Sequence, residues 1–374
     1  MPIESNTDSR IVMTLDAGGT LLKFSAIRGN QLLLGPVSRP TEADNLDRCL
    51  TNIVEGFESI KQQLPSPPAA ISFAFPGPAD YPAGIISNVG NLPAFRGSVA
   101  LGPFLEEKFK IPVFINNDGD LFVYGEAIAG FLPYVNRLLE KEGNPKRFHN
   151  LFGITLGTGL GGGIVRNGEL FIGDNSAGGE VWLLRNKLDP GINAEEGASI
   201  RAVRKVYASC CGISVDRAPE PKTIFEIGMG QAEGNQEAAR EAFRRLGEVA
   251  GDVVAQALTL VDGLAVVGGG MAGAYPLFLR WLVAAANAEY EGRKDGMRRL
   301  IPRTFNIEDA EERSRFLRGD VREITVPGSA RKVQYDPMQR AAVGISRLGT
   351  SEAVAIGAYA FALSRLDRPT GKGE

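Results

Sequence analysis

The sequence predicts an α/β fold built from two related domains, and three observations support this. The chain has 374 residues, more than one compact core usually holds, so two domains are expected. Apolar runs of strand length alternate with stretches of helical periodicity, which is typical of α/β domains with central sheets. A strand, a Gly/Thr turn, a strand, a Gly-containing turn and a strand follow one another at 11–36. The pattern returns from 151, about 140 residues later, which indicates an internal repeat.

The first half of the chain contains the first copy of this repeat and the elements that follow it. IVMTLDA, LLKFSAI and QLLLG are predicted as strands, and residues 42–64 as a helix because apolar residues recur at helical spacing. AAISFAF and IPVFIN are expected to be buried strands, and residues 99–109 a short helix. The next helix is expected to begin near Leu121, with Asp120 as its N-cap.

The second half begins with LFGITLGTGLGGGIVRNGELFIG, which repeats the opening design. Residues 237–260 are predicted as a long amphipathic helix, GLAVVGGG as a strand entering three glycines, and PLFLRWLVAAANAEY as a helix. SEAVAIGAYAFALSRL is a closing helix. The charged stretch 288–335 is interpreted as an exposed insertion rather than core. Cys210 and Cys211 are expected to be a buried pair on a helix.

Composition excludes several classes of protein. With 44% hydrophobic and 23% charged residues, the chain is an ordinary globular protein. The net charge of −3 argues against a broad nucleic-acid-binding face. The three cysteines contain no CxxC pair, so neither a disulfide framework nor a cysteine zinc site is indicated. The polar N-terminus does not resemble a signal peptide, and no apolar stretch reaches membrane-spanning length. A cytoplasmic protein without a DNA-binding module is therefore expected.

The stretch TLDAGGTLLKF interrupts the first strand with a carboxylate and two glycines. Gly18 and Gly19 would let backbone N–H groups approach a phosphate closely, and Thr20 adds a hydroxyl donor. Asp16 could hold a hydrated Mg²⁺ beside that phosphate. The alternative, which DAGGT alone favours, is a hairpin turn chosen for positive φ.

A second Gly/Thr turn, Gly157-Thr158-Gly159, occupies the equivalent point of the repeat. It also matches the GxGxxG fingerprint of dinucleotide-binding proteins, with Glu180 near the spacing of a ribose-binding acid. That fingerprint requires a helix after its glycines, whereas IVRNGELF predicts a hairpin. A third glycine run, Gly268 to Gly270, could lie against an adenosine; a plain strand-to-helix turn is the alternative.

The segment NNDGD follows a buried strand and offers an acid–base group. Asp118 is assigned as the carboxylate that accepts a hydroxyl proton during phosphoryl transfer, and Asn117 offers donors and an acceptor. Glu180 and Glu195, in polar glycine-containing stretches, could bind sugar hydroxyls, although most such glutamates are solvated surface. His149, the only histidine, is interpreted as structural.

In order, DAGGTLLK, FPGPAD with SNVGNLPAF, NNDGD, GTGLGGGIVRNGELFIG and VVGGG resemble the motifs of the ROK family (repressors, open reading frames and kinases). The resemblance covers nearly the whole chain. It implies the actin-like ATPase (ribonuclease H-like) fold with an interdomain cleft that binds ATP. The N-terminal domain would span 1–117, joined by the closing helix 352–367. The C-terminal domain would span 118–351, with the insertion near 288–335.

The resemblance also implies a role for each matching residue. Asp118 would be the general base, and Asp16 would place Mg²⁺, through water. The ATP phosphates would be bound by Gly18, Gly19, Thr20, Gly157, Thr158 and Gly159. The nucleoside would lie against Gly268, Gly269 and Gly270. The sugar would be bound by Asn91, Asn117, Glu180 and Glu195.

Two departures from the family pattern affect specificity. The family usually has GE-x-G-H, whose histidine contacts sugar and often binds zinc, but here Trp182 and Leu183 replace the glycine and the histidine. The cysteine-rich zinc loop is also absent, so no zinc site is predicted. The sugar pocket has lost a polar contact, which leaves glucose specificity open.

Three hypotheses follow for function. The first is a cytoplasmic, homodimeric, ATP- and Mg²⁺-dependent kinase of a hexose or modified hexose, without nucleic-acid or membrane partners. The second is a catalytically weak or inactive sugar-binding regulator on the same fold. The third, an NAD-dependent enzyme, depends on GxGxxG alone. The sugar, the hydroxyl that is phosphorylated and the use of polyphosphate as donor stay open.

Overall fold

The computed structural model describes residues 6–77, 79–87, 89–90, 92–290 and 296–368. The chain forms two compact units. The first comprises residues 1–130, 168–178 and 348–374, and the second comprises 131–167 and 179–347. Both are mixed α/β, as the sequence predicts. Helix α3 (Asp118–Ile128), which follows residue 117, is part of the first unit.

The first unit is organised around a five-stranded sheet in the order β3-β2-β1-β4-β8. Strands β1 to β3 form an antiparallel meander, while β4 and β8 run parallel to β1. The strands are β1 (Val12–Ala17), β2 (Leu21–Arg28), β3 (Gln31–Pro40), β4 (Ala70–Ala74) and β8 (Val113–Asn116). A small second sheet contains β5 (Ala79–Asp80), β6 (Ile85–Ser87) and β7 (Ser98–Val99), and η1 (Pro93–Phe95) precedes β7.

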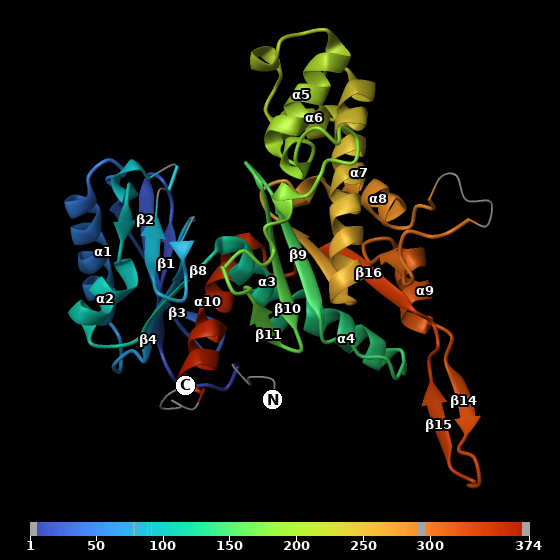
Figure 1. Cartoon of the computed structure of the whole chain (residues 1–374), viewed down its shortest axis with the longest axis horizontal. Coiled ribbons are helices and arrows are strands. Elements are labelled where there is room, and N and C mark those ends of the chain that lie inside the picture. Colours follow the sequence, from blue (N-terminus) through green and yellow to red (C-terminus); the bar gives the residue numbers. More distant parts are fainter. Residues whose placement is uncertain (1–5, 78, 88, 91, 291–295, 369–374) are drawn as a thin grey trace. The chain divides into compact units, whose positions relative to one another are not determined.

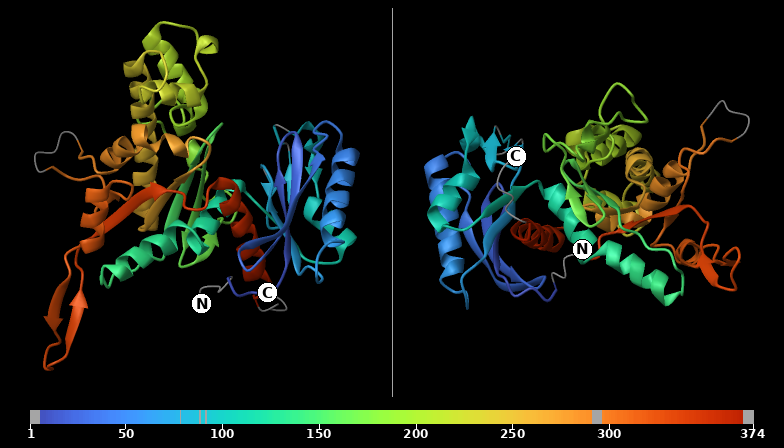
Figure 2. Two further views of the ribbon diagram at one scale, coloured as in Figure 1. Left: turned by 180° about the vertical axis from the view of Figure 1, so that it is seen from behind. Right: turned by 60° about the horizontal axis from the view of Figure 1, so that its bottom comes forward.

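Helices cover both faces of the five-stranded sheet (Figure 2). On one face, α1 (Leu46–Lys61) and α2 (Leu101–Phe109) enclose an aromatic core in which the rings of Phe24 and Phe57 lie 5.1 Å apart. On the other face, Tyr359 of α10 (Thr350–Leu366) packs against Val12. Successive strand residues point to opposite faces, so the apolar run of β1 serves both cores.

Helices α3 and α10 cross at unusually short range. A Cβ atom on Gly125 would collide with the carbonyl oxygen of Ala353, and one on Gly357 with that of Leu121. The crossing fixes the N-terminal ends of both helices within the first unit. The expected start of α3 near Leu121 is wrong: the helix begins at Asp118, and its N-cap is Asn117, whose side chain accepts from the N–H of Gly119 at 2.7 Å.

The second unit repeats the plan of an antiparallel pair followed by parallel strands. Its strands follow the order β10-β9-β12-β16-β13; β9 and β10 are antiparallel, and β9, β12, β16 and β13 are mutually parallel. They are β9 (Leu151–Leu156), β10 (Leu160–Arg166), β12 (Leu264–Gly268), β13 (Arg303–Asn306) and β16 (Arg340–Ile345); β11 (Glu169–Phe171) follows β10 in the chain. The predicted internal repeat is therefore present in the strand pattern.

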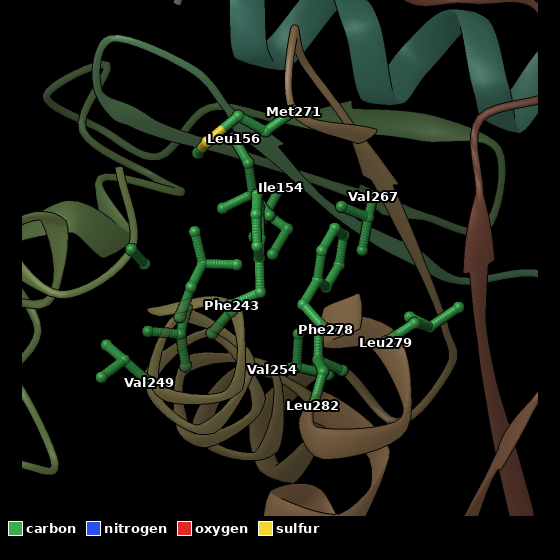
Figure 3. Packing of buried hydrophobic residues seen from close by; sticks show 14 of the residues in the cluster. Ile154, Leu156, Phe243, Val249, Val254, Val267, Met271, Phe278, Leu279 and Leu282 are labelled. Atoms are coloured by element: carbon green, nitrogen blue, oxygen red, sulfur yellow. The ribbon is translucent and has the colours of Figure 1, made fainter. Parts of the chain in front are cut away.

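The core of the second unit lies under two long helices. Phe243 of α7 (Gln236–Val261) and Phe278 of α8 (Tyr275–Ala286) pack with Ile154 and Val267 of the sheet (Figure 3). The other helices are α4 (Phe131–Lys141), η2 (Val181–Leu183), η3 (Ala194–Glu196), α5 (Ile200–Cys211), η4 (Val215–Arg217), α6 (Pro221–Gly228), η5 (Ala272–Ala274) and α9 (Ala310–Arg318). None of the helices in the described ranges has the length and apolar character needed to cross a membrane.

Two expectations about exposure are wrong. The stretch 288–335 is not wholly outside the core, because β13 belongs to the main sheet and Phe305 and Phe316 are buried. Its exposed part is the hairpin of β14 (Arg322–Thr325) and β15 (Lys332–Tyr335), which extends away from the sheet of its unit (Figure 1). Cys210 is exposed and Cys211 half-buried, since they lie at the end of α5.

Candidate functional site

A cavity of about 800 Å³ in the first unit brings together residues from distant parts of the chain. Asp16 at the end of β1, Lys23 of β2, Asp118 at the start of α3 and Thr350 at the start of α10 all line it. The parallel strands β1 and β4 end at the same edge of the sheet, where ligands of α/β proteins bind. The cavity therefore joins the two aspartates to which the sequence assigns magnesium placement and proton transfer.

The surroundings of Asp118 raise the proton affinity of its carboxylate. The N–H of Gly119 donates to its carboxylate at 2.9 Å, and the side chain stays accessible within the cavity. Desolvation by the surrounding protein raises the pKa of Asp118. Hydrogen bonds from the backbone N–H groups of Gly119 and Asp118 oppose this, and the negative charge of Asp16 adds to the rise. A carboxylate with a raised pKa accepts a proton more readily than an ordinary one.

The turn between β1 and β2 is not explained by backbone conformation. Neither Gly18 nor Gly19 has a positive φ, so the hairpin interpretation based on positive φ is wrong. The turn is closed by Gly18 N–H donating to Leu21 O at 3.0 Å, and Thr41 donates its hydroxyl to Gly18 O at 2.6 Å. A Cβ atom on Gly19 would meet nothing within 4 Å. The chain itself does not require glycine at 19, whereas close approach of a ligand would.

The turn between β9 and β10 shows the same feature at Gly157, where a Cβ atom would also meet nothing within 4 Å. Gly159 differs, because a Cβ atom there would lie 2.5 Å from the carboxylate of Glu195. Strand β10 follows this turn, and Asn167 and Gly168 at its far end both have positive φ, as a type I′ hairpin requires. The GxGxxG segment therefore lacks the helix that a dinucleotide-binding turn needs.

Glu195 stabilises the turn between β9 and β10 through hydrogen bonds. Its carboxylate accepts from the N–H of Leu160 at 3.1 Å and from Arg201 at 2.8 Å, and Arg201 also donates to Thr158 O at 3.1 Å. A carboxylate offers about four acceptor positions, so these bonds leave room for a sugar hydroxyl. The predicted contact of Glu195 with sugar stays a prediction.

Glu180 is held by the residue that departs from the family pattern. The indole N–H of Trp182 donates to the Glu180 carboxylate, and the Trp182 ring packs partly against the core. Leu183, in the position of the family histidine, is 61% exposed. Trp182 therefore orients Glu180, while Leu183 presents an apolar surface to solvent.

The glycines after β12 divide into two kinds. Gly269 has φ of 86° and its Cβ atom would collide with the backbone of Leu156, so the fold requires glycine there. Gly270 has no such requirement, because its φ is not positive and a Cβ atom would meet nothing within 4 Å. The plain turn explains Gly269 but not Gly270.

The remaining predicted residues are placed only in part. Asn91 lies outside the described residues. Asn117 serves as the cap of α3, and its amide reaches the Tyr81 hydroxyl at 3.5 Å. Within the ranges that the structure describes, no three His, Cys, Asp or Glu side chains are grouped to hold a metal ion.

Sequence reasoning missed Lys23, Thr350 and Ser351, which also line the cavity. Lys23 lies directly opposite Asp16 in the β1–β2 ladder, and opposite residues of an antiparallel pair share a face. Pairing residues outward from the Gly18-Gly19 turn places Lys23 opposite Asp16 and would have found it. Thr350 and Ser351 follow Gly349 at a helix start, where hydroxyls and the positive end of the helix dipole suit anions.

Comparisons with known proteins by sequence and by structure identify the same family. The ROK family model matches residues 12–295. The crystal structure of a glucokinase from Parabacteroides distasonis is 53% identical, with a TM-score of 0.89, covering 97% of this chain and 99% of that one. An N-acetyl-D-glucosamine kinase of Vibrio parahaemolyticus is 28% identical over 267 residues, covering 68% of this chain and 83% of that protein.

More distant structures show the fold alone. A ROK family glucokinase from Streptomyces griseus in complex with glucose and AMPPNP is 20% identical, with a TM-score of 0.59, covering 95% of this chain and 99% of that one. A ROK family transcriptional regulator is 17% identical, with a TM-score of 0.64, covering 96% of this chain and 81% of that one. The ROK sugar kinases among these neighbours have the actin-like ATPase fold, which confirms the predicted fold class.

Proposed function

The chain belongs to the ROK family, and from this membership we propose that it is an ATP-dependent sugar kinase. It transfers the γ-phosphoryl group of ATP to a hydroxyl of a hexose or modified hexose. The observation that carries the proposal is the cavity shared by Asp16 and Asp118, two carboxylates that the sequence separates by a hundred positions. The relatives named as glucokinase and N-acetyl-D-glucosamine kinase support hexoses and N-acetylhexosamines as the first acceptors to test.

In this proposal Asp118 accepts the proton of the sugar hydroxyl as its oxygen attacks the γ-phosphorus. The new O–P bond forms while the bond to the β-phosphate oxygen breaks, and ADP leaves. The raised pKa of Asp118 favours this proton transfer. Lys23, which lines the same cavity, supplies a positive charge near the transferred group.

The nucleotide is held by the two turns and the third glycine run. Gly19, Gly157 and Gly270 leave open the space that a side chain would fill, so backbone N–H groups can approach the phosphates and the nucleoside. Asp16 fits magnesium, because its carboxylate is exposed in the cavity and forms no ion pair with described residues. When bound, Mg²⁺ neutralises phosphate charge; no zinc is invoked.

The sugar is assigned to Asn91, Asn117, Glu180 and Glu195. The hydrogen bond from Trp182 fixes the orientation of Glu180. A cytoplasmic homodimer remains the expected form of the enzyme.

The test is ATP consumption with Mg²⁺ across hexoses, N-acetylhexosamines and ketoses, for the parent protein, Asp118→Asn and Asp216→Asn. Asp216 is an exposed carboxylate of η4 in the other unit, so its variant controls for the charge change. We expect sugar-dependent turnover that falls roughly 100- to 10,000-fold in Asp118→Asn and persists in Asp216→Asn. Unchanged turnover in Asp118→Asn would refute the assigned base.

The alternative is a sugar-binding regulator on the same fold, since a regulator is among the structural neighbours. Calorimetric binding of a sugar without phosphoryl transfer to any member of the panel would favour it. The kinase is supported instead by the cavity that Asp16 and Asp118 share, and by the presence of glycines that the fold does not require.

A further inference from the structure

The second unit contains two adjoining recesses that have no part in the proposed reaction. The larger has a volume of about 490 Å³ and is bordered by residues 146–150, the end of α7 and residues 299–302. The smaller, of about 320 Å³, is bordered by β13, α9 and residues 337–339. Ile301 and Gln339 line both. The two recesses therefore adjoin in a single unit, and together they are called the depression.

Positive charge dominates this depression. Seven lysine and arginine residues line it, against a single carboxylate, Asp262. Two of the seven form ion pairs with described residues, Arg299 with Asp252 at 2.8 Å and Arg340 with Asp336 at 2.6 Å. Counting all three carboxylates still leaves four positive charges, in a chain whose net charge is −3. An excess of like charges is repulsive, so binding of an anion in the depression is favoured.

The smaller recess has the geometry to grip a phosphate. The guanidinium groups of Arg303 and Arg315 both lie over the ring of Phe305, at 5.3 and 6.0 Å from its centre, and Arg298 lines the same recess. None of the three forms an ion pair with a described residue. Arginine presents a planar fork of donors that matches phosphate oxygens, and both arginines line the same recess.

The larger recess adds apolar surface. Arg340 borders it only with its backbone, because its side chain is inaccessible to solvent and pairs with Asp336 at 2.6 Å. Leu258 and Ile301 also border this recess, and Ile301 is 71% exposed. Exposed apolar surface beside a basic pocket suits a ligand with an organic part and an anionic end.

We propose that this depression is a binding site for a small phosphorylated metabolite, either a sugar phosphate or a nucleoside monophosphate. Its phosphate lies between Arg303 and Arg315, and its organic part lies against Ile301 in the larger recess. The site is built from the second unit alone, without Asp16 or Asp118, and so does not depend on the proposed kinase activity.

Isothermal titration calorimetry with glucose 6-phosphate, AMP, inorganic phosphate and unphosphorylated glucose tests the proposal. The variant Arg303→Gln with Arg315→Gln removes two charges from the recess. The matched control, Arg318→Gln with Arg322→Gln, removes two charges from exposed positions, the end of α9 and the start of β14, that do not line it. Ile301→Glu places a negative charge at the junction without disturbing the core, since Ile301 is exposed.

We expect a phosphorylated probe to bind the parent and the control alike. Binding should weaken at least about 10-fold in the recess double variant, from loss of charge-assisted bonds, and in Ile301→Glu, from repulsion. The stronger of glucose 6-phosphate and AMP identifies the organic part. Equal affinity of all three variants would place any binding elsewhere and overturn the proposal, as would the absence of binding by every phosphorylated probe. Thermal unfolding by circular dichroism confirms that each variant is folded.

Discussion

At the scale of single residues, Gly269 and Gly270 are adjacent, but the fold needs glycine at only one of them. A side chain at 269 would require an unfavourable left-handed backbone and would collide with Leu156. At 270 the backbone is ordinary and the surrounding space is open. A glycine that the fold does not need is best explained by a ligand that approaches the backbone closely.

This pair gives a sharp prediction. Gly270→Ala, like Gly19→Ala and Gly157→Ala, should leave the melting temperature within about 2 °C of the parent. If the proposed nucleotide site is correct, each should raise KM for ATP, because the added methyl group would occupy the space proposed for the nucleotide. Gly269→Ala should instead destabilise the fold by roughly 1–3 kcal/mol. Differential scanning calorimetry and initial-rate kinetics separate the two effects. An unchanged KM for ATP in all three stable variants would contradict the nucleotide assignment.

The sequence identified the aspartates of the site, but only part of their surroundings. Asp16 and Asp118 follow buried strands next to glycines, a signal visible without coordinates. Lys23 could be found only through its register opposite Asp16, and the place of Thr350 in the cavity depends on the crossing of α3 with α10. The Glu180–Trp182 hydrogen bond was equally out of reach, since it depends on the conformation of a short 3-10 turn.

At the scale of elements, the β14–β15 hairpin is the least integrated part of the second unit. All four residues of β14 are exposed, and the hairpin extends away from the sheet (Figure 1). Ile324 faces Val333 across the ladder, and both are on the same side as Tyr335. An isolated two-stranded hairpin gains little stability of its own, so it contributes little to the core.

We therefore predict that replacing residues 322–335 by a short Gly-Ser linker leaves the fold intact. The melting temperature should change by less than about 2 °C, because no core side chain is removed. Calorimetry and light scattering on the truncated chain test this. A fall in molar mass at unchanged melting temperature would show that the hairpin joins subunits. A large loss of stability would contradict the weak packing of the hairpin.

Charge composition misled the interpretation of this region because exposure was inferred from charge alone. The stretch 288–335 contains enough charged residues to suggest an insertion. Some of its apolar residues, among them Phe305, Ile307 and Phe316, are nevertheless buried. They form the edge of the sheet and the contact of α9 with it. The positions of a few apolar residues therefore predict burial in this stretch better than its average charge does.

At the scale of the whole molecule, the internal repeat correctly indicated two α/β units with related strand plans, because hydrophobic patterning specifies strands locally. Contacts distant in sequence could not be read from it. Asn144 donates to Asp336 at 2.9 Å across 192 positions, and Asp336 forms a buried ion pair with Arg340 at 2.6 Å. Such polar networks are specified by tertiary packing rather than by periodicity.

This network predicts how the protein unfolds in acid. Burial alone would raise the pKa of Asp336, but hydrogen bonds from Asn144, Arg340 and the N–H groups of Asp320 and Met338 lower it to about 2. A carboxyl whose pKa is lower in the folded than in the unfolded state adds stability above the unfolded value. That contribution, about 2 kcal/mol for Asp336, is lost as the pH falls from about 4 to about 2.

The two tryptophans, Trp182 and Trp281, both lie in the second unit, so tryptophan fluorescence during urea unfolding reports on the unit that contains Asp336. We expect the free energy of unfolding of the parent to fall steeply below pH 4. Asp336→Asn should already be destabilised by roughly 3–5 kcal/mol at pH 7, since it leaves the buried Arg340 unpaired, and should show a shallower dependence on pH between 4 and 2. The exposed Asp216→Asn should follow the parent throughout. If Asp336→Asn kept the full acid sensitivity of the parent, other carboxylates, such as Glu241 with its pKa of about 2, would have to account for it.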